Sequence, residues 1–183
     1  MTSSFAPGLL IAMPQLLDPN FHRAVVLVVE HGKEGSFGLV INQVSPLTMG
    51  EFTNAQSLSY GGDPSKPVMI GGPVSREVGW ILHGSELEYG DTHKVTEGIS
   101  MSRSMVALKD VCSKGSSGFR LFMGYAGWGP GQLESEITQG AWVTTDVDPS
   151  LVFADNASAV WETSLRNMGI NPMALVPGGS AIN

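Results

Sequence analysis

The chain has 183 residues, of which 42% are hydrophobic and 15% are charged, and 17 acidic against 10 basic residues give a net charge of −7. This length and composition predict one globular domain over residues 1–183 with a sizeable core. Proteins that bind nucleic acid neutralise phosphate with lysine and arginine. The acidic balance and the scattered basic residues therefore argue against nucleic acid as a partner.

No segment of the sequence has the pattern of a membrane span or a secretory signal. The longest apolar run, from Ala24 to Glu30, is far shorter than the roughly 20 residues of a spanning helix. The N-terminal apolar segment has no basic region before it and is interrupted by Pro7 and Pro14, unlike a signal peptide. We therefore expect a cytoplasmic protein with no membrane partner.

The only cysteine, Cys112, excludes an internal disulfide and a cysteine-based metal site. Its position in the helical pattern SMVALKDVC places it on the same face as Met105 and Leu108. This pattern predicts a buried and unreactive thiol.

The first half of the chain is predicted to form strands that pair as hairpins. The runs AVVLVVE and FGLVIN, separated by HGKEGS, predict a hairpin with a loop of about six residues. Thr48 and Glu51 have the spacing of a capping box, which predicts a helix over 49–56. The strands expected in this half are 8–13, 24–30, 37–42, 68–74 and 78–84.

The second half is predicted to contain three helices, each closed by a glycine, at 102–113, 130–139 and 157–168. Short strands are expected at 94–99, 119–127 and 141–147, with loose order from about residue 170. Pairs of strands with single helices between them indicate an α+β fold with a mainly antiparallel or mixed sheet.

The stretch GYAGWGPGQLESEI, which begins at Gly124, raises the question of a phosphate-binding loop. The position three residues after Gly131 is Glu134, which breaks the dinucleotide fingerprint, and the Walker A lysine is missing. The run is better interpreted as a tight turn that places Tyr125 and Trp128 on neighbouring elements. A loop that binds an anion or another ligand is the alternative.

The search for catalytic and metal-binding patterns yields no signature, so neither a cofactor nor a metal is predicted. The histidines lack the spacing of a helical zinc pair, and GSSG at 115–118 lacks the spacing of a nucleophile elbow. His31, beside Glu30, and His83 both end predicted strands and could meet if those strands are neighbours. Ordinary strand-end residues bonded to backbone are the favoured interpretation.

Three long segments, LLIAMPQLLDPNFHRAVVLVVEHGKEGSFGLVIN, IGGPVSREVGWILH and GYAGWGPGQLESEITQGAW, resemble the YqgE/AlgH family of bacterial proteins in sequence and order. The resemblance extends from about Gly8 to Gly169 and implies one cytosolic α+β domain with coiled, bifurcated sheets. The family's closing Gly-His-Ala is replaced by GGSAIN at 178–183, so no role of a C-terminal histidine carries over.

The resemblance implies no specific activity, because members of the family are described as being of unknown biochemical function. The AlgH name carries a proposed role in regulating alginate synthesis and transcription. Buried polar groups must be paired or used, so we expect any binding site to draw on the polar and aromatic residues of these motifs. Those residues are Arg23, Glu30, His31, Asn42, His83, Trp128, Gln132 and Glu136.

Three functions fit the sequence, in decreasing order of support. The first is a binding or regulatory protein that acts through an unknown protein partner or a small ligand. The second is an enzyme of unknown reaction that uses Glu30, His31 and His83. The third is a direct DNA-binding regulator, which the net charge disfavours.

Overall fold

The computed structural model describes residues 4–115 and 118–175. Its contacts group the chain into two compact units. Unit 1 combines the N-terminal residues up to Asn42 with the residues from Ala126 onward, and unit 2 spans Gln43–Tyr125. The expectation of a single domain over residues 1–183 stays a prediction. Among the described residues, no helix has the length and hydrophobicity that a membrane crossing requires.

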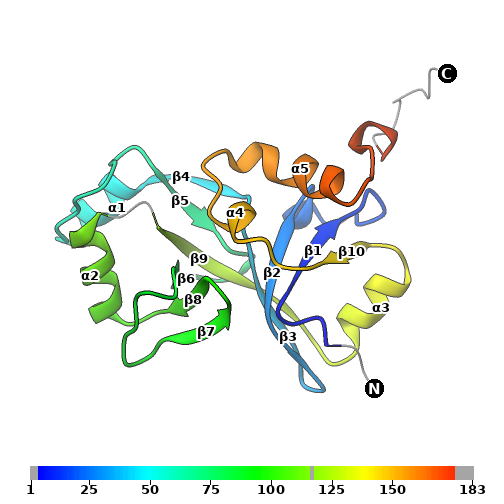
Figure 1. Ribbon diagram of the computed structural model, residues 1–183, viewed down its shortest axis with the longest axis horizontal. Helices are drawn as coiled ribbons and strands as arrows, with labels where there is room; N and C mark the ends of the chain where they lie inside the picture. The colour runs from blue at the N-terminus through cyan, green and yellow to red at the C-terminus, as the bar shows by residue number, and fades with distance from the viewer. Residues whose placement is uncertain (1–3, 116–117, 176–183) are drawn as a thin grey trace. The chain divides into compact units, whose positions relative to one another are not determined.

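Unit 1 is an antiparallel sheet with strand order β10-β1-β2-β3-β9, to which β9 contributes its last residues (Figure 1). Every residue of β1 is buried, as are the first five of β2, which explains their continuous apolar sequence. The elements of unit 1 are β1 (Gly8–Ala12), η1 (Pro19–Phe21), β2 (Val25–Gly32), β3 (Gly35–Val40), the end of β9 (Phe119–Trp128), α3 (Gln132–Thr138), β10 (Trp142–Thr145), α4 (Pro149–Val152), η2 (Ala157–Ala159), α5 (Val160–Asn167) and η3 (Pro172–Leu175).

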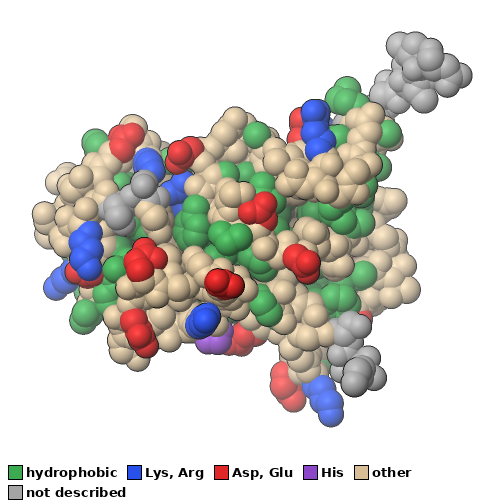
Figure 2. Space-filling model, in the orientation of Figure 1, with side chains coloured by type: hydrophobic (Ala, Val, Ile, Leu, Met, Phe, Trp, Pro, Cys, Tyr) green, Lys and Arg blue, Asp and Glu red, His purple; other side chains and the backbone are tan. Residues whose placement is uncertain are grey.

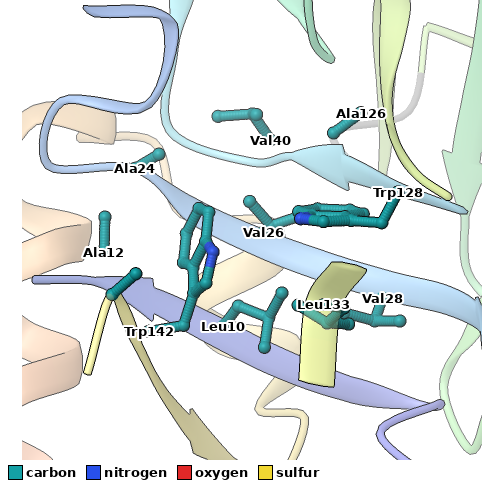
Figure 3. Close-up of a cluster of buried hydrophobic side chains, with 11 residues drawn as sticks. Leu10, Ala12, Ala24, Val26, Val28, Val40, Ala126, Trp128, Leu133 and Trp142 are labelled. Atoms are coloured by element: carbon teal, nitrogen blue, oxygen red, sulfur yellow. The ribbon is translucent and has the colours of Figure 1, made fainter. Parts of the chain in front are cut away.

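The core of unit 1 is built around two tryptophans. Trp128 and Trp142 lie with their ring centroids 6.0 Å apart in an edge-to-face arrangement, a geometry that aromatic pairs prefer. Figure 3 shows their indoles among aliphatic side chains of the sheet and Leu133 of α3. This packing fixes α3 against the sheet.

Unit 2 is a mixed sheet with strand order β4-β5-β9-β6-β8-β7, in which only the β5–β9 pair is parallel. Its elements are β4 (Val44–Thr48), α1 (Met49–Ala55), β5 (Pro67–Ile70), β6 (Val74–His83), β7 (His93–Thr96), β8 (Ile99–Ser102), α2 (Met105–Lys114) and the first part of β9. The two units together confirm the α+β class and the mainly antiparallel or mixed sheet.

Cys112 is buried in the core of unit 2, as expected, and burial raises the pKa of its thiol to about 11. The predicted helix face is partly wrong, however. Cys112 shares its buried face with Ala107 and Val111, whereas Met105 is 52% exposed in the first turn of α2.

Local sequence signals predicted several elements correctly. Thr48 and Glu51 form the reciprocal hydrogen bonds of a capping box at the start of α1. Gly115 adopts a left-handed conformation at the end of α2, with φ of 59°. In each case, the interacting residues are a few positions apart, so the sequence contains the whole signal.

The loop of the first hairpin is much shorter than the predicted six residues. Gly32 pairs with Gly35, which leaves only Lys33 and Glu34 in the turn. Gly35 has φ of 126°, a conformation that favours glycine. A 2.7 Å contact between the side chains of His31 and Ser36 joins the strands where the loop was expected.

Other differences concern short elements. β4 and α4 were not predicted, and the strand expected over 94–99 is two strands, β7 and β8. The segment expected to be loosely ordered includes a 3-10 turn at Pro172–Leu175. Residues 176–183, with the altered tail, and residues 116–117 of the GSSG segment lie outside the described residues.

Candidate functional site

Three of the residues predicted for a binding site, Trp128, Gln132 and Glu136, lie together where β9 turns into α3. The Glu136 carboxylate accepts hydrogen bonds from the indole of Trp128 at 2.7 Å and from that of Trp142 at 3.1 Å. The side-chain oxygen of Gln132 accepts the backbone N–H of Gly129 at 3.0 Å. These bonds give two buried indole donors an acceptor and support the interpretation of the glycine run as a turn.

His31 connects the first hairpin to the same helix. One ring nitrogen lies 2.7 Å from the hydroxyl of Ser36 and the other 3.3 Å from a carboxylate oxygen of Glu134. The ring of Phe5 meets the imidazole edge-on, with centroids 5.0 Å apart. The neighbouring Glu30 is exposed on β2, so the two adjacent residues have different surroundings.

His83 belongs to unit 2 and is completely buried. Its Nδ1 lies 2.9 Å from the carbonyl oxygen of Gly84, which can only accept, so Nδ1 carries a proton. Its Nε2 contacts the hydroxyl of Ser102, which in turn contacts Thr92, both at 2.8 Å. His31 and His83 therefore each have partners within their own unit, and a joint site with Glu30 stays a prediction.

Arg23 occupies an unusual backbone position in the segment between η1 and β2. The N–H of Ala24 donates to the carbonyl of Phe21 at 3.1 Å, and His22 has φ of −59° and ψ of 118°. Arg23 follows with φ of 52°. These values define a type II turn, whose third residue is normally glycine or asparagine. An arginine there costs about 1–2 kcal/mol of backbone strain.

Asn42 holds this turn from the residues that follow β3. Its side-chain N–H donates to the carbonyl of Arg23 at 2.9 Å, and its side-chain oxygen accepts the N–H of Val25 at the same distance. One amide thus fixes the backbone on both sides of Ala24. The structure therefore brings together two predicted site residues, Arg23 and Asn42.

The side chain of Arg23 lies over an aromatic ring from α5. Its guanidinium carbon is 5.1 Å from the centre of the Trp161 ring, within cation–π range. The indole N–H of Trp161 donates to the carbonyl of Ala12 at 2.8 Å, which fixes the ring on β1. Among residues 4–115 and 118–175, no carboxylate forms an ion pair with the guanidinium.

Arg23 and Trp161 border a cavity of about 140 Å³. Its buried members are apolar, whereas His22 and Arg23 are exposed and therefore line its solvent-facing side, which we call the mouth. A dry engineered cavity of about this volume binds benzene. The described lining residues are Ala12, Met13, Pro14, Leu16, His22, Arg23, Trp161 and Leu175, and we call this cavity the Arg23 pocket.

Sequence reasoning identified Arg23 but missed most of this pocket. Trp161 was predicted to lie in a helix, yet nothing in the sequence pairs that helix with the residues around Arg23. The sequence DPNFHR before the buried strand β2 is consistent with a turn, but an arginine gives no sign of a left-handed backbone. The unusual conformation of Arg23 is apparent only from its φ of 52°.

A sequence model described as AlgH-like matches residues 9–173. The chain belongs to the AlgH-like family. A UPF0301 protein of Myxococcus xanthus is 45% identical to it over 176 residues, which cover 96% of this chain and 97% of the relative. A UPF0301 protein of Vibrio cholerae is 35% identical over 91% of this chain and 92% of its own length.

Two solved structures have a similar fold. The solution structure of the AlgH protein from Pseudomonas aeruginosa is similar with a TM-score of 0.77 at 32% identity, covering 96% of this chain and 94% of that one. A crystal structure of a Corynebacterium diphtheriae protein has a TM-score of 0.74 at 25% identity, covering 97% and 92%. The names of these relatives specify no activity.

Proposed function

We propose that this protein binds a small organic anion in the Arg23 pocket, and that it acts in the cytoplasm as a binding or regulatory protein. The observation that carries the proposal is the guanidinium of Arg23, held by a strained turn at the mouth of an apolar cavity without a carboxylate partner among the described residues. Backbone strain of this kind is concentrated at functional sites.

The chemistry of the pocket favours a ligand with two parts. The arginine supplies charge-assisted hydrogen bonds, each about twice as strong as a neutral one. The apolar lining, which includes Met13, Leu16 and Trp161, gains free energy when it covers an apolar ligand body. Sites for small molecules commonly combine an apolar lining with a few polar groups of this kind.

Nucleic acid does not fit the charge of this chain. The net charge is −7, and Figure 2 shows acidic and basic side chains interspersed over the visible face. An extended polyanion would meet these carboxylates, whereas a small anion needs only the mouth of one pocket.

Thermal melting of the full chain with small organic anions and their neutral analogues tests the proposal. Anions that bind the folded state raise the melting temperature in a concentration-dependent way. Arg23→Asn is the matched control, since asparagine tolerates the left-handed backbone but carries no charge. The proposal fails if no anion raises the melting temperature, or if Arg23→Asn responds as the unchanged protein does.

A further inference from the structure

The identity of the anionic group can be argued from the donors around the mouth of the Arg23 pocket. We infer that the ligand is a monocarboxylate on a compact branched or aromatic body about as large as benzoate, an inference that rests on the proposed function. Its charged group would meet Arg23, and its body would lie against Trp161, Met13 and Leu16.

The geometry of Arg23 suits a carboxylate. A guanidinium that stacks on an aromatic ring keeps its N–H groups directed along its own plane, where two of them match the two oxygens of a carboxylate. The guanidinium carbon of Arg23 lies over the Trp161 ring, 5.1 Å from its centre, and Asn42 holds the Arg23 backbone. A carboxylate would therefore gain a bidentate partner whose backbone is held by Asn42 and whose guanidinium is restricted by the Trp161 ring.

On the side of the pocket formed by residues 12–16, a phosphate group would find few free backbone donors. Phosphate sites usually recruit several backbone N–H groups from a glycine-rich loop or a helix start. In this pocket, the N–H groups of Ala12, Met13 and Leu16 already donate to the carbonyls of Ala24, Ala141 and Met13. Pro14 has no N–H. The mouth thus offers one guanidinium and one imidazole as its side-chain donors.

The volume of the pocket limits the ligand body. A cavity of about 140 Å³ has room for a six-membered ring or a short branched chain. A ligand of roughly nine non-hydrogen atoms that gains about 0.5–0.75 kcal/mol per atom, between the values for the best tiny ligands and for drug-sized ones, has a Kd between roughly 10 µM and 1 mM. A long acyl chain or a nucleotide exceeds this volume.

Three probes with the same phenyl body separate the contributions of charge and shape. We would titrate benzoate, benzamide and phenylphosphonate into the full chain by calorimetry, with backbone amide NMR shifts to locate binding. Benzoate is expected to bind at least tenfold more tightly than benzamide and phenylphosphonate, because only benzoate presents a planar anion. Shifts at residues 12–16 and 22–24 should accompany its binding.

Two variants complete the experiment. Arg23→Asn should bring the affinities for benzoate and benzamide to within about twofold of each other. Leu16→Trp, at a half-buried position, should weaken all three probes by filling the pocket while leaving Arg23 in place. A benzoate preference that survives Arg23→Asn would overturn the inference.

The remaining outcomes distinguish the inference from the proposed function. Tighter binding of phenylphosphonate than of benzoate in the pocket would overturn the carboxylate inference and leave anion binding intact. Equal binding of benzamide and benzoate, or no binding of any probe at millimolar concentration, would overturn both.

Discussion

The guanidinium of Arg23 lies 5.1 Å from the centre of the Trp161 ring, although its own backbone is in the left-handed region. A cation–π contact at an exposed site contributes about 0.5–1 kcal/mol, less than the strain of about 1–2 kcal/mol. The contact alone does not offset the strain. Because the strain exceeds the cation–π energy, we infer that Arg23 has a further role, and binding of an anion fits that role.

Asn42 is expected to act as a positioning residue for Arg23. Asn42→Asp keeps the acceptor for the N–H of Val25 but removes the donor to the carbonyl of Arg23. Benzoate affinity should fall about three- to tenfold, and stability by about 1–2 kcal/mol. Calorimetry would measure the effect of Asn42→Asp on benzoate affinity in the unchanged protein and in Arg23→Asn. In Arg23→Asn, the second substitution should lower the affinity no further. A further loss in that background would contradict a role through Arg23.

Glu136 is expected to stabilise unit 1 through the two tryptophans. Glu136→Ala leaves two buried indole N–H groups without their acceptor, each at a cost of about 1–3 kcal/mol. The free energy of unfolding should therefore fall by about 2–6 kcal/mol in urea denaturation. Glu136→Gln keeps one oxygen that can accept both bonds, and it should lose less than half as much. Equal losses would show that the charge matters more than the acceptor.

Alanine substitutions of Gly124 and Gly131 separate backbone strain from steric contact in the glycine run. Both glycines have positive φ, 78° and 74°. A Cβ at Gly124 would lie 2.5 Å from the carbonyl oxygen of Gly72, whereas one at Gly131 would meet nothing within 4 Å. Gly131→Ala should cost about 1–2 kcal/mol from backbone strain alone. Gly124→Ala should cost at least about 2 kcal/mol more in urea denaturation, because a backbone carbonyl must also move. Similar losses would remove the steric argument.

Tyr89 is expected to make stability depend on alkaline pH. Burial and a 2.6 Å hydrogen bond to Asp110 raise its pKa to about 12, from 10.0. Between these values, the unfolded chain loses the phenolic proton while the folded chain keeps it, so the free energy of unfolding falls as pH rises from 10 to 12. Tyr89→Phe should flatten this fall, and absorbance titration should lose its most alkaline phenolate transition. A titration near 10 for Tyr89 would contradict the prediction.

The sequence predicted those parts of the fold that depend on local pattern. The capping box at Thr48 and the closing turn at Gly115 are complete within a few residues, and the buried strands are apparent as apolar runs. The family resemblance was carried by long segments of this kind, and the comparisons confirm it. Short elements such as β4, which contains Pro46 and has no buried residue, lack such a pattern.

The pocket could not be predicted because its contacts join distant parts of the chain. Trp161 is fixed by the carbonyl of Ala12, and a backbone acceptor has no sequence signature. Similarly, Glu136 was a candidate for binding because it is polar, but its hydrogen bonds to Trp128 and Trp142 depend on how α3 packs on the sheet. Residue type indicated that these groups needed partners, and only the fold determined which partners.

Calorimetric titration of benzoate into the unchanged protein and into Arg23→Asn tests the central claim most directly. The account predicts a Kd below about 1 mM for the unchanged protein and at least tenfold weaker binding for Arg23→Asn. The melting temperatures of the two unliganded proteins should agree within a few degrees, because asparagine relieves the strain that arginine imposes. Equal affinity of the two proteins for benzoate, or no measurable heat of binding to either, would contradict it.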